Sequence, residues 1–210
     1  MKELEKIIAK KLLQIKAIKL QPANPFIWAS GWKSPIYCDN RKTLSYPAIR
    51  NTIKIELART IEENYPEVTA IAGVATGAIA QGALVADLLG LPFVYIRSER
   101  KDHGLENLIE GELRTDAKVV IVEDLISTGL SSLKAVQAVR NFGCKVVGMV
   151  AIFTHGFPVA KKKFEEAKVP LITLSNYNAI IEEAVRINYI SEDDVEILQE
   201  WRKAPDKWEG

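Results

Sequence analysis

The chain has 210 residues, of which 48% are hydrophobic and 26% are charged, and its formal net charge is +1. This composition is that of a soluble globular protein with a sizeable core. Because the net charge is close to zero, no overall field favours nucleic acid or an acidic membrane, and we expect neither as a partner. Two cysteines provide neither a disulfide framework nor the spacing of a metal site.

The amino-terminal residues predict an amphipathic helix, because apolar side chains recur among charged ones between Leu4 and Ile15. This pattern differs from the uninterrupted apolar stretch of a signal peptide, and no segment approaches the ~20 apolar residues of a membrane span. We therefore expect a cytoplasmic protein. An irregular stretch follows, residues 22–46, which is rich in aromatic residues, Pro and Ser. It suits either a lid over a flat ring or a small hydrophobic flap.

From residue 47 onward, helical and strand-like patterns alternate. The predicted helices are residues 47–65, 78–89, 133–142, 157–167 and 191–203. The predicted strands are residues 68–74, 93–96, 119–122, 145–153 and 171–174. The alternation predicts an α/β fold with a mainly parallel, twisted sheet that is flanked by helices. No linker or internal repeat interrupts it, so we expect one domain, residues 1–210, with an amino-terminal elaboration over residues 1–46.

Two loops between these elements have unusual residue content. Residues 73–78 are small, which lets backbone approach a ligand but also suits tight packing of a strand on a helix. Residues 97–104 are rich in acidic and basic side chains, as in a solvated surface loop. A catalytic interpretation is also open, because Lys101 and His103 could neutralise a departing polyphosphate and shuttle a proton while the loop closes over the site.

The most informative segment is residues 119–132, which read V-V-I-V-E-D-L-I-S-T-G-L-S-S. Its β-branched run predicts a strand that is buried on both faces, and Glu123 and Asp124 follow at the end where ligands bind in such sheets. Hydroxyl side chains and Gly129 come next, at a helix start that suits an anion. The carboxylates suit sugar hydroxyls rather than phosphate. The segment therefore predicts a sugar-phosphate site, and it matches neither the P-loop nor the dinucleotide-binding motif.

This segment resembles the phosphoribosyl pyrophosphate (PRPP) motif of the type I phosphoribosyltransferases. The resemblance implies the fold of that family, with residues 1–46 forming an amino-terminal helix and hood. It also implies that the acidic pair contacts the ribose 2′ and 3′ hydroxyls and that the following loop holds the 5′-phosphate. The PRPP contacts implied in this segment are Glu123, Asp124, Leu125, Ile126, Ser127, Thr128, Gly129, Leu130 and Ser131.

The strings K-D-H-G and S-G-W-K-S-P resemble the catalytic loop and the hood of the orotate phosphoribosyltransferases in particular. By this resemblance, Arg97, Lys101 and His103 contact the pyrophosphate end of PRPP. The catalytic residues are then Lys101, His103 and Asp124, and Ser127 also faces the base. In that family the Arg97–His103 loop reaches into the site of the partner subunit, which implies a homodimer.

The implied reaction joins orotate to the phosphoribosyl group of PRPP and releases pyrophosphate, with Mg²⁺ carried by PRPP and no metal site in the protein. The same two strings argue against a purine phosphoribosyltransferase. Lys101 argues against a PRPP-sensing regulator without catalysis. Three candidates remain for the group that holds the orotate carboxylate: Lys33, Arg41 and backbone amides.

Overall fold

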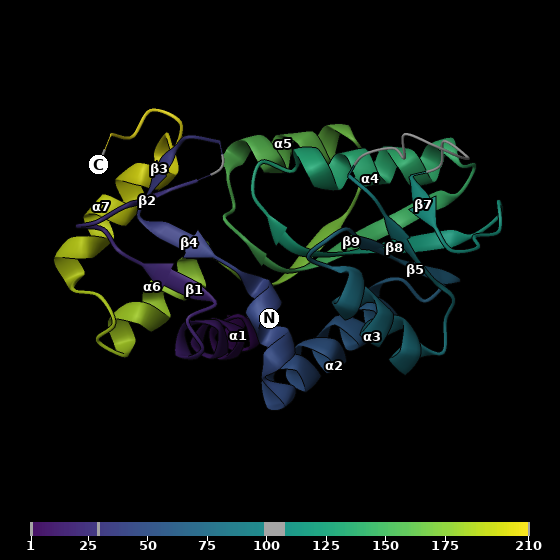
Figure 1. The fold of residues 1–210 in the computed structure, drawn as a ribbon, viewed down its shortest axis with the longest axis horizontal. Helices are drawn as coiled ribbons and strands as arrows, with labels where there is room; N and C mark the ends of the chain where they lie inside the picture. Colours follow the sequence, from purple (N-terminus) through teal and green to yellow (C-terminus); the bar gives the residue numbers. More distant parts are fainter. Residues whose placement is uncertain (1, 29, 99–107, 210) are drawn as a thin grey trace.

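A six-stranded sheet forms the centre of the molecule in the computed structural model, which describes residues 2–28, 30–98 and 108–209. The strand order is β10-β9-β8-β5-β6-β7 (Figure 1). All neighbours pair in parallel except the short β7, which is antiparallel to β6 at one edge. The prediction of a mainly parallel sheet is therefore confirmed. The strands are β5 (Ala70–Val74), β6 (Phe93–Ile96), β7 (Ile109–Glu110), β8 (Lys118–Ile126), β9 (Lys145–Thr154) and β10 (Leu171–Asn176).

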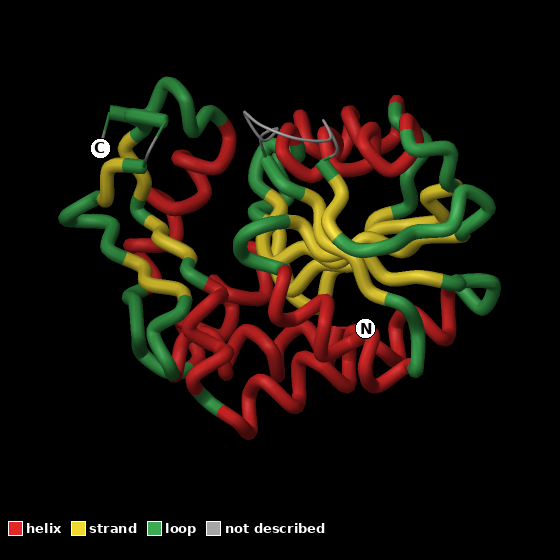
Figure 2. Tube along the Cα trace, turned by 45° about the vertical axis from the view of Figure 1, so that its right-hand side comes forward, coloured by secondary structure: helices red, strands yellow, loops and turns green. Residues whose placement is uncertain are grey.

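Helices cover both faces of this sheet (Figure 1 and Figure 2). In β8, Val119 and Ile121 join the apolar core beneath α4 and α5, whereas Val120 and Val122 join the larger core against α1, α2 and α3. Successive side chains of a strand point to opposite faces, so the unbroken apolar run supplies both cores at once. The helices are α1 (Lys2–Gln14), α2 (Pro47–Asn64), α3 (Ile79–Leu89), α4 (Leu130–Asn141) and α5 (Pro158–Glu166).

The two ends of the chain form a lobe beside the sheet, on the left of Figure 1. It contains two antiparallel ribbons, β1 with β4 and β2 with β3, together with α6 and α7. The indole of Trp201 in α7 is fully buried, and its Nε1 donates to the carbonyl of Lys33, 3.1 Å away. We call residues 18–46 the hood. The elements of this lobe are β1 (Ile18–Leu20), β2 (Phe26–Ile27), β3 (Lys33–Ser34), β4 (Ile36–Cys38), the 3₁₀ helix η1 (Asn40–Ser45), α6 (Tyr177–Arg186) and α7 (Glu192–Lys203).

Local sequence signals explain where several helices begin. Pro47 and Pro158 occupy the first turns of α2 and α5, where a missing N–H is harmless. Ser191 and Asp194 form a reciprocal capping box at the start of α7. The Asn176 side chain accepts from a backbone N–H in the first turn of α6. The predicted helix at residues 191–203 is confirmed.

The structure differs from the predicted elements around the acidic pair. Strand β8 continues to Ile126, because its pairing with β9 extends to Thr154, so Glu123 and Asp124 lie within the strand rather than beyond it. Helix α4 begins at Leu130 and not at residue 133. Sequence patterns also missed β1 to β4, β7 and α6. The ribbons have only two or three residues per strand, which is too short for a readable period, and they form because a partner strand lies beside them.

Among the described residues, no helix combines the length and the apolarity that crossing a membrane requires. Cys38 and Cys144 are both free thiols. The description of residues 1–210 as one domain stays a prediction.

Candidate functional site

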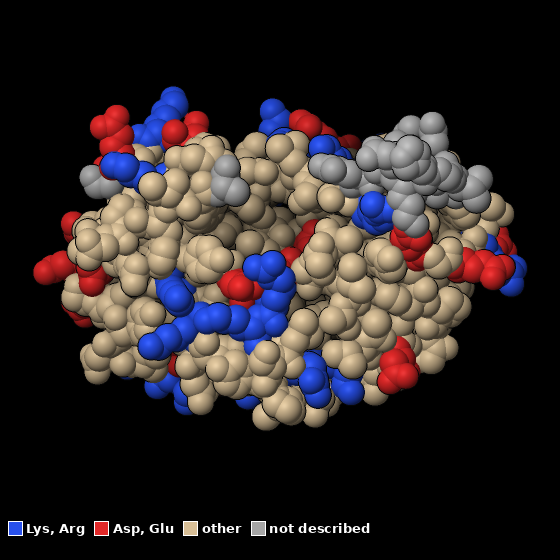
Figure 3. All heavy atoms as spheres, in the orientation of Figure 1, with Lys and Arg blue, Asp and Glu red and all other residues tan. Residues whose placement is uncertain are grey.

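A cleft opens between the hood and the carboxyl ends of β5 and β8, and its volume is about 370 Å³. Figure 3 shows a hollow near the centre of one face, with acidic and basic side chains at its edge. The hood, the loop after β5 and the loop after β8 all converge on the cleft. The residues that line it are Cys38, Asp39, Arg41, Val74, Ala75, Thr76, Gly77, Glu123, Asp124, Leu125, Ser127, Thr128, Gly129 and Ser131.

Glu123 is the more deeply buried member of the acidic pair, with 4% of its surface exposed. Its Oε1 accepts from the backbone N–H of Asp124 and its Oε2 from the hydroxyl of Ser132, each at 3.0 Å. Burial raises the pKa of Glu123 well above its usual range, and the adjacent Asp124 carboxylate raises this pKa further. The contact with Ser132 ties the carboxylate to the first turn of α4, so strand and helix hold it in one orientation.

Asp124 is the carboxylate held between the sheet and the hood. The side-chain amide of Asn40, itself 2% exposed, donates to the Asp124 carbonyl at 2.6 Å and so joins η1 to β8. Burial raises the pKa of the Asp124 carboxyl, while its peptide contacts and the nearby Arg41 charge act in the opposite direction. On the far side, a Cβ added at Gly77 would fall on the Asp124 carboxyl group. Only glycine at residue 77 leaves space for that carboxylate.

Replacing Gly77 with Ala should therefore weaken PRPP binding at least ~10-fold, because the new methyl group displaces a carboxylate that the sequence motif predicts to contact the ribose. Titration calorimetry with PRPP measures this loss. Urea unfolding of the same variant separates the effect from incomplete folding. Wild-type affinity for PRPP in folded Gly77→Ala protein would show that Asp124 does not need this space.

The loop between β8 and α4, residues 127–129, lines the cleft. The carbonyl of Ile126 accepts from the His155 N–H at 3.0 Å and from the Thr154 hydroxyl at 3.2 Å, which fixes the start of the loop. Gly129 ends it at φ = 78°, in the left-handed region, and an added Cβ would come within 3.0 Å of the Phe164 ring. The first N–H groups of α4 lack partners within the helix and form a positive end that suits phosphate.

A neighbouring cavity of about 600 Å³ shares the loops after β5 and β8 with the cleft. It brings in Arg97, whose Nη1 lies 3.4 Å from Glu110 Oε1, and the Lys134 side chain of α4. Arg97 is thus placed beside the predicted phosphate loop. The other two predicted pyrophosphate contacts, Lys101 and His103, lie outside the described residues.

Comparisons with known proteins agree with this geometry. Residues 46–187 match the model of the phosphoribosyl transferase domain family. The chain is 70% identical over 208 residues to the orotate phosphoribosyltransferase of Porphyromonas gingivalis, covering 99% of both chains. It is 68% identical to the enzyme of the same name from Bacteroides thetaiotaomicron, covering 100% of this chain and 99% of that one. The chain belongs to the orotate phosphoribosyltransferase family.

The fold agrees with that membership. The crystal structure of orotate phosphoribosyltransferase from Aeropyrum pernix superimposes with a TM-score of 0.76 at 27% identity, covering 88% of this chain and 99% of that chain. The predicted type I phosphoribosyltransferase fold is therefore confirmed.

A cluster of aromatic rings joins the hood to α7 and to the end of β9. His155 follows β9, is 1% exposed and stacks on Phe157 with centroids 5.4 Å apart. Trp28 of the hood and Trp201 of α7 lie against the same imidazole at 5.2 and 5.9 Å. Burial lowers the pKa of His155 to about 3, and the charge of Arg202 lowers it further, so the ring is neutral near pH 7. The hood is thereby anchored on a neutral aromatic platform.

Because His155 titrates far below its unfolded pKa, which is near 6.5, acid should destabilise the protein. Between these two values the unfolded chain binds one more proton than the folded chain, so the free energy of unfolding falls as pH falls. Lowering the pH from ~7 to ~5 should cost about 2 kcal/mol through this residue. Urea unfolding at both pH values should show that loss in the wild type and a smaller loss in His155→Phe. Equal losses in the two proteins would contradict the assignment.

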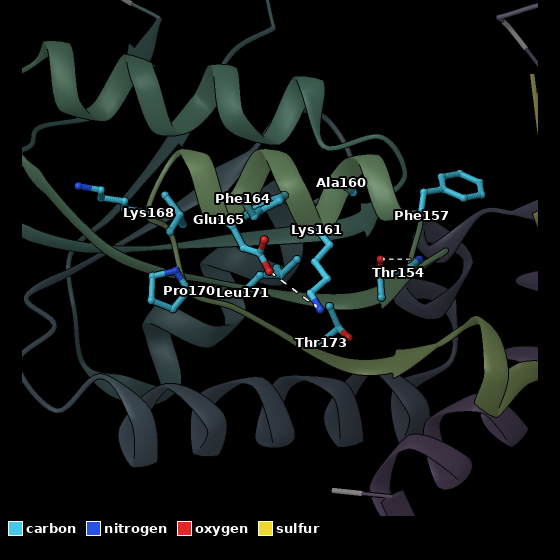
Figure 4. A pocket seen from close by; sticks show the side chains of 12 residues that line it. Thr154, Phe157, Ala160, Lys161, Phe164, Glu165, Lys168, Pro170, Leu171 and Thr173 are labelled. Atoms are coloured by element: carbon cyan, nitrogen blue, oxygen red, sulfur yellow. Dashed lines mark hydrogen bonds and ion pairs between the residues drawn. The ribbon is translucent and has the colours of Figure 1, made fainter. Parts of the chain in front are cut away.

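A larger cavity, of about 670 Å³, lies between α5 and the edge strand β10 (Figure 4). Its walls are mostly apolar, and its charged groups include Lys161 and Glu165, which pair across one helical turn at 4.0 Å. The ring of Phe157 points away from the other labelled side chains. None of the predicted site residues lines this cavity, and it has no paired carboxylates, so we place the reaction in the smaller cleft.

The structure brings together residues that sequence patterns did not connect. Asp39 and Asn40 of the hood reach the acidic pair, although more than 80 residues separate them along the chain. Lys134 joins the phosphate loop because α4 begins at Leu130, which places Lys134 on the same side as Ser131 one turn earlier. A predicted helix that began at Leu130 would have placed Lys134 beside this loop. No pattern in the sequence indicates that the hood lies against β8.

Proposed function

We propose that the chain transfers the 5-phosphoribosyl group from PRPP to orotate, giving orotidine 5′-monophosphate and pyrophosphate in pyrimidine biosynthesis. One observation carries the proposal: a single cleft combines buried paired carboxylates with a helix-start phosphate loop. The full-length similarity to proteins named orotate phosphoribosyltransferase supports the choice of base. In this reaction a bond forms between the orotate nitrogen and the ribose anomeric carbon, and pyrophosphate leaves with the electron pair of the broken C–O bond.

The acidic pair and the phosphate loop hold the sugar of PRPP. Glu123 and Asp124 orient the ribose through its 2′ and 3′ hydroxyls, and their negative charge favours the cation-like sugar of the transition state. Backbone N–H groups at the start of α4 bind the 5′-phosphate. Ser127 also faces the base. The proposed contacts of this loop are Leu125, Ile126, Ser127, Thr128, Gly129, Leu130 and Ser131. Of these, Ile126 is fully buried and Leu130 lines the neighbouring cavity, whereas the other five line the cleft.

The pyrophosphate end is assigned to the charged loop that follows β6. Arg97 borders the cavity beside the phosphate loop and supports this placement. Lys101 stabilises the leaving pyrophosphate and His103 handles its proton. We propose that the chain is a homodimer in which each Arg97–His103 loop serves the partner's site, and that the enzyme works in the cytoplasm.

Mg²⁺ is the proposed cofactor and arrives with PRPP. No group of three metal-ligating side chains occurs in the described part of the chain. The carboxylates of Glu123 and Asp124 nevertheless fit an ion that a substrate brings with most of its own oxygen ligands, because Mg²⁺ prefers hard oxygen donors and usually binds one or two carboxylates beside substrate phosphates. Bound there, the ion would neutralise charge on the leaving pyrophosphate.

Purified protein with orotate, PRPP and Mg²⁺ should consume the ultraviolet absorbance of orotate and produce pyrophosphate. Adenine, guanine and hypoxanthine serve as competing bases under the same conditions. Turnover of a purine without loss of orotate would overturn the proposal in favour of a purine phosphoribosyltransferase. PRPP binding without turnover of any base would favour a sensor.

A further inference from the structure

The cleft must accept the negative charge that distinguishes orotate from uracil. Its described lining contains three carboxylates, from Asp39, Glu123 and Asp124, and one positive side chain, Arg41. These carboxylates repel another negative group, so the carboxylate of orotate needs a cation beside it to bind in this cleft. We infer that the guanidinium of Arg41 binds the orotate carboxylate and makes the site selective for orotate over uracil. This inference rests on the proposed function.

The position of Arg41 suits this role. It lies in η1, which follows β4, so it reaches the cleft from the hood. Its Nε donates to Asp39 Oδ1 at 2.7 Å, and among the described residues this is its one hydrogen bond. The two terminal Nη groups stay available, and the side chain is 57% exposed. A planar guanidinium held at Nε presents these two groups as a fork that matches a carboxylate.

None of the other cations of the hood, Lys19, Lys33 and Lys42, lines the cleft. Lys33 donates from Nζ to the carbonyl of Glu209 at 2.6 Å, on the side of the carboxy-terminal tail, and it does not line the cleft. Lys42 donates to a backbone carbonyl after α1 at 3.3 Å. His155, although it faces the hood, is buried and neutral. Arg41 is therefore the cation that the structure offers among the described residues of the cleft and hood.

Binding of two product nucleotides tests the inference without turnover. Orotidine 5′-monophosphate and uridine 5′-monophosphate differ only by the carboxylate, and titration calorimetry gives both affinities. The wild type should prefer the carboxylated nucleotide. Arg41→Ala and Arg41→Gln should each reduce that preference at least ~10-fold, the effect of losing a hydrogen bond to a charged group, while affinity for uridine 5′-monophosphate changes little. The preference of Arg41→Lys should lie between that of the wild type and that of the two neutral variants. Lys33→Ala should keep the wild-type preference.

Each outcome of these titrations either supports or overturns the role of Arg41. An unchanged preference in both Arg41→Gln and Arg41→Ala, or an equal loss of affinity for the two nucleotides, would overturn the inference. Loss of the preference in Lys33→Ala alone would reassign the carboxylate to Lys33. Because Arg41 is exposed, Arg41→Gln should fold like the wild type, which thermal unfolding can verify. A wild-type protein that binds neither nucleotide and does not consume orotate would instead refute the proposed function itself.

Discussion

Replacing Asp124 with Asn should reduce turnover of orotate and PRPP by ~100- to 1,000-fold, the range for removing one preorganised electrostatic contact from an active site. The amide has the shape of the carboxylate but no charge to favour the cation-like sugar, and it accepts fewer hydrogen bonds from the ribose. The carbonyl that Asn40 contacts is unchanged, so the strand and hood should stay joined. Steady-state rates with saturating PRPP measure the loss.

The free energy of unfolding of Asp124→Asn should stay the same or rise, although its turnover falls. Burial raises the pKa of Asp124, which means that folding destabilises the charged carboxylate relative to the unfolded chain. A neutral amide avoids that desolvation, so urea unfolding should show stability equal to or above that of the wild type. Asp116→Asn is the matched control, because Asp116 pairs with Arg114 on the surface, away from the cleft. Full activity in Asp124→Asn, or equal loss in Asp116→Asn, would refute the role of Asp124.

Replacing Trp201 with Ala should lower the free energy of unfolding by about 3–5 kcal/mol, the usual cost of deleting a buried tryptophan. The indole is fully buried and touches Trp28, Phe157 and Tyr177 at centroid separations of 5.5 to 5.8 Å. Its loss also frees the carbonyl of Lys33 from its donor. Since these contacts join α7 to the hood, we expect the KM for orotate to rise more than the KM for PRPP in the folded fraction of this variant.

Trp201→Phe separates packing from the hydrogen bond. The phenyl ring keeps most of the contacts but cannot donate to Lys33, so its cost should be about 1–3 kcal/mol. Guanidinium chloride unfolding of both variants provides the comparison. If Trp201→Phe were as unstable as Trp201→Ala, the hydrogen bond rather than the ring packing would hold the lobe together. If both variants were as stable as the wild type, the hood would not depend on α7.

Much of the sheet was predictable because its signals are local. The apolar run from Val119 to Val122 reports burial on both faces of a strand, and the positions of Pro47 and Ser191 mark where helices begin. Helix α6 also has local signals, the Asn176 cap and apolar residues on one face, although the predicted elements omitted it. The hood ribbons were not predictable in the same way. Their strands are too short to have a period, and they depend on pairing with segments that only the folded chain brings alongside.

The same distinction between local and long-range signals applies to the candidate site. By itself, the sequence predicted the acidic pair, the loop for phosphate and the charged loop that contains Lys101, because each is a contiguous string whose chemistry is readable from neighbouring residues. Only the tertiary structure decided that Glu123 is tied to Ser132, that Gly77 makes space for Asp124, and that Arg41 rather than Lys33 enters the cleft. Those relations join segments that are distant in the chain. They follow from strand order, the extension of β8 and the docking of the hood, none of which a local pattern can encode.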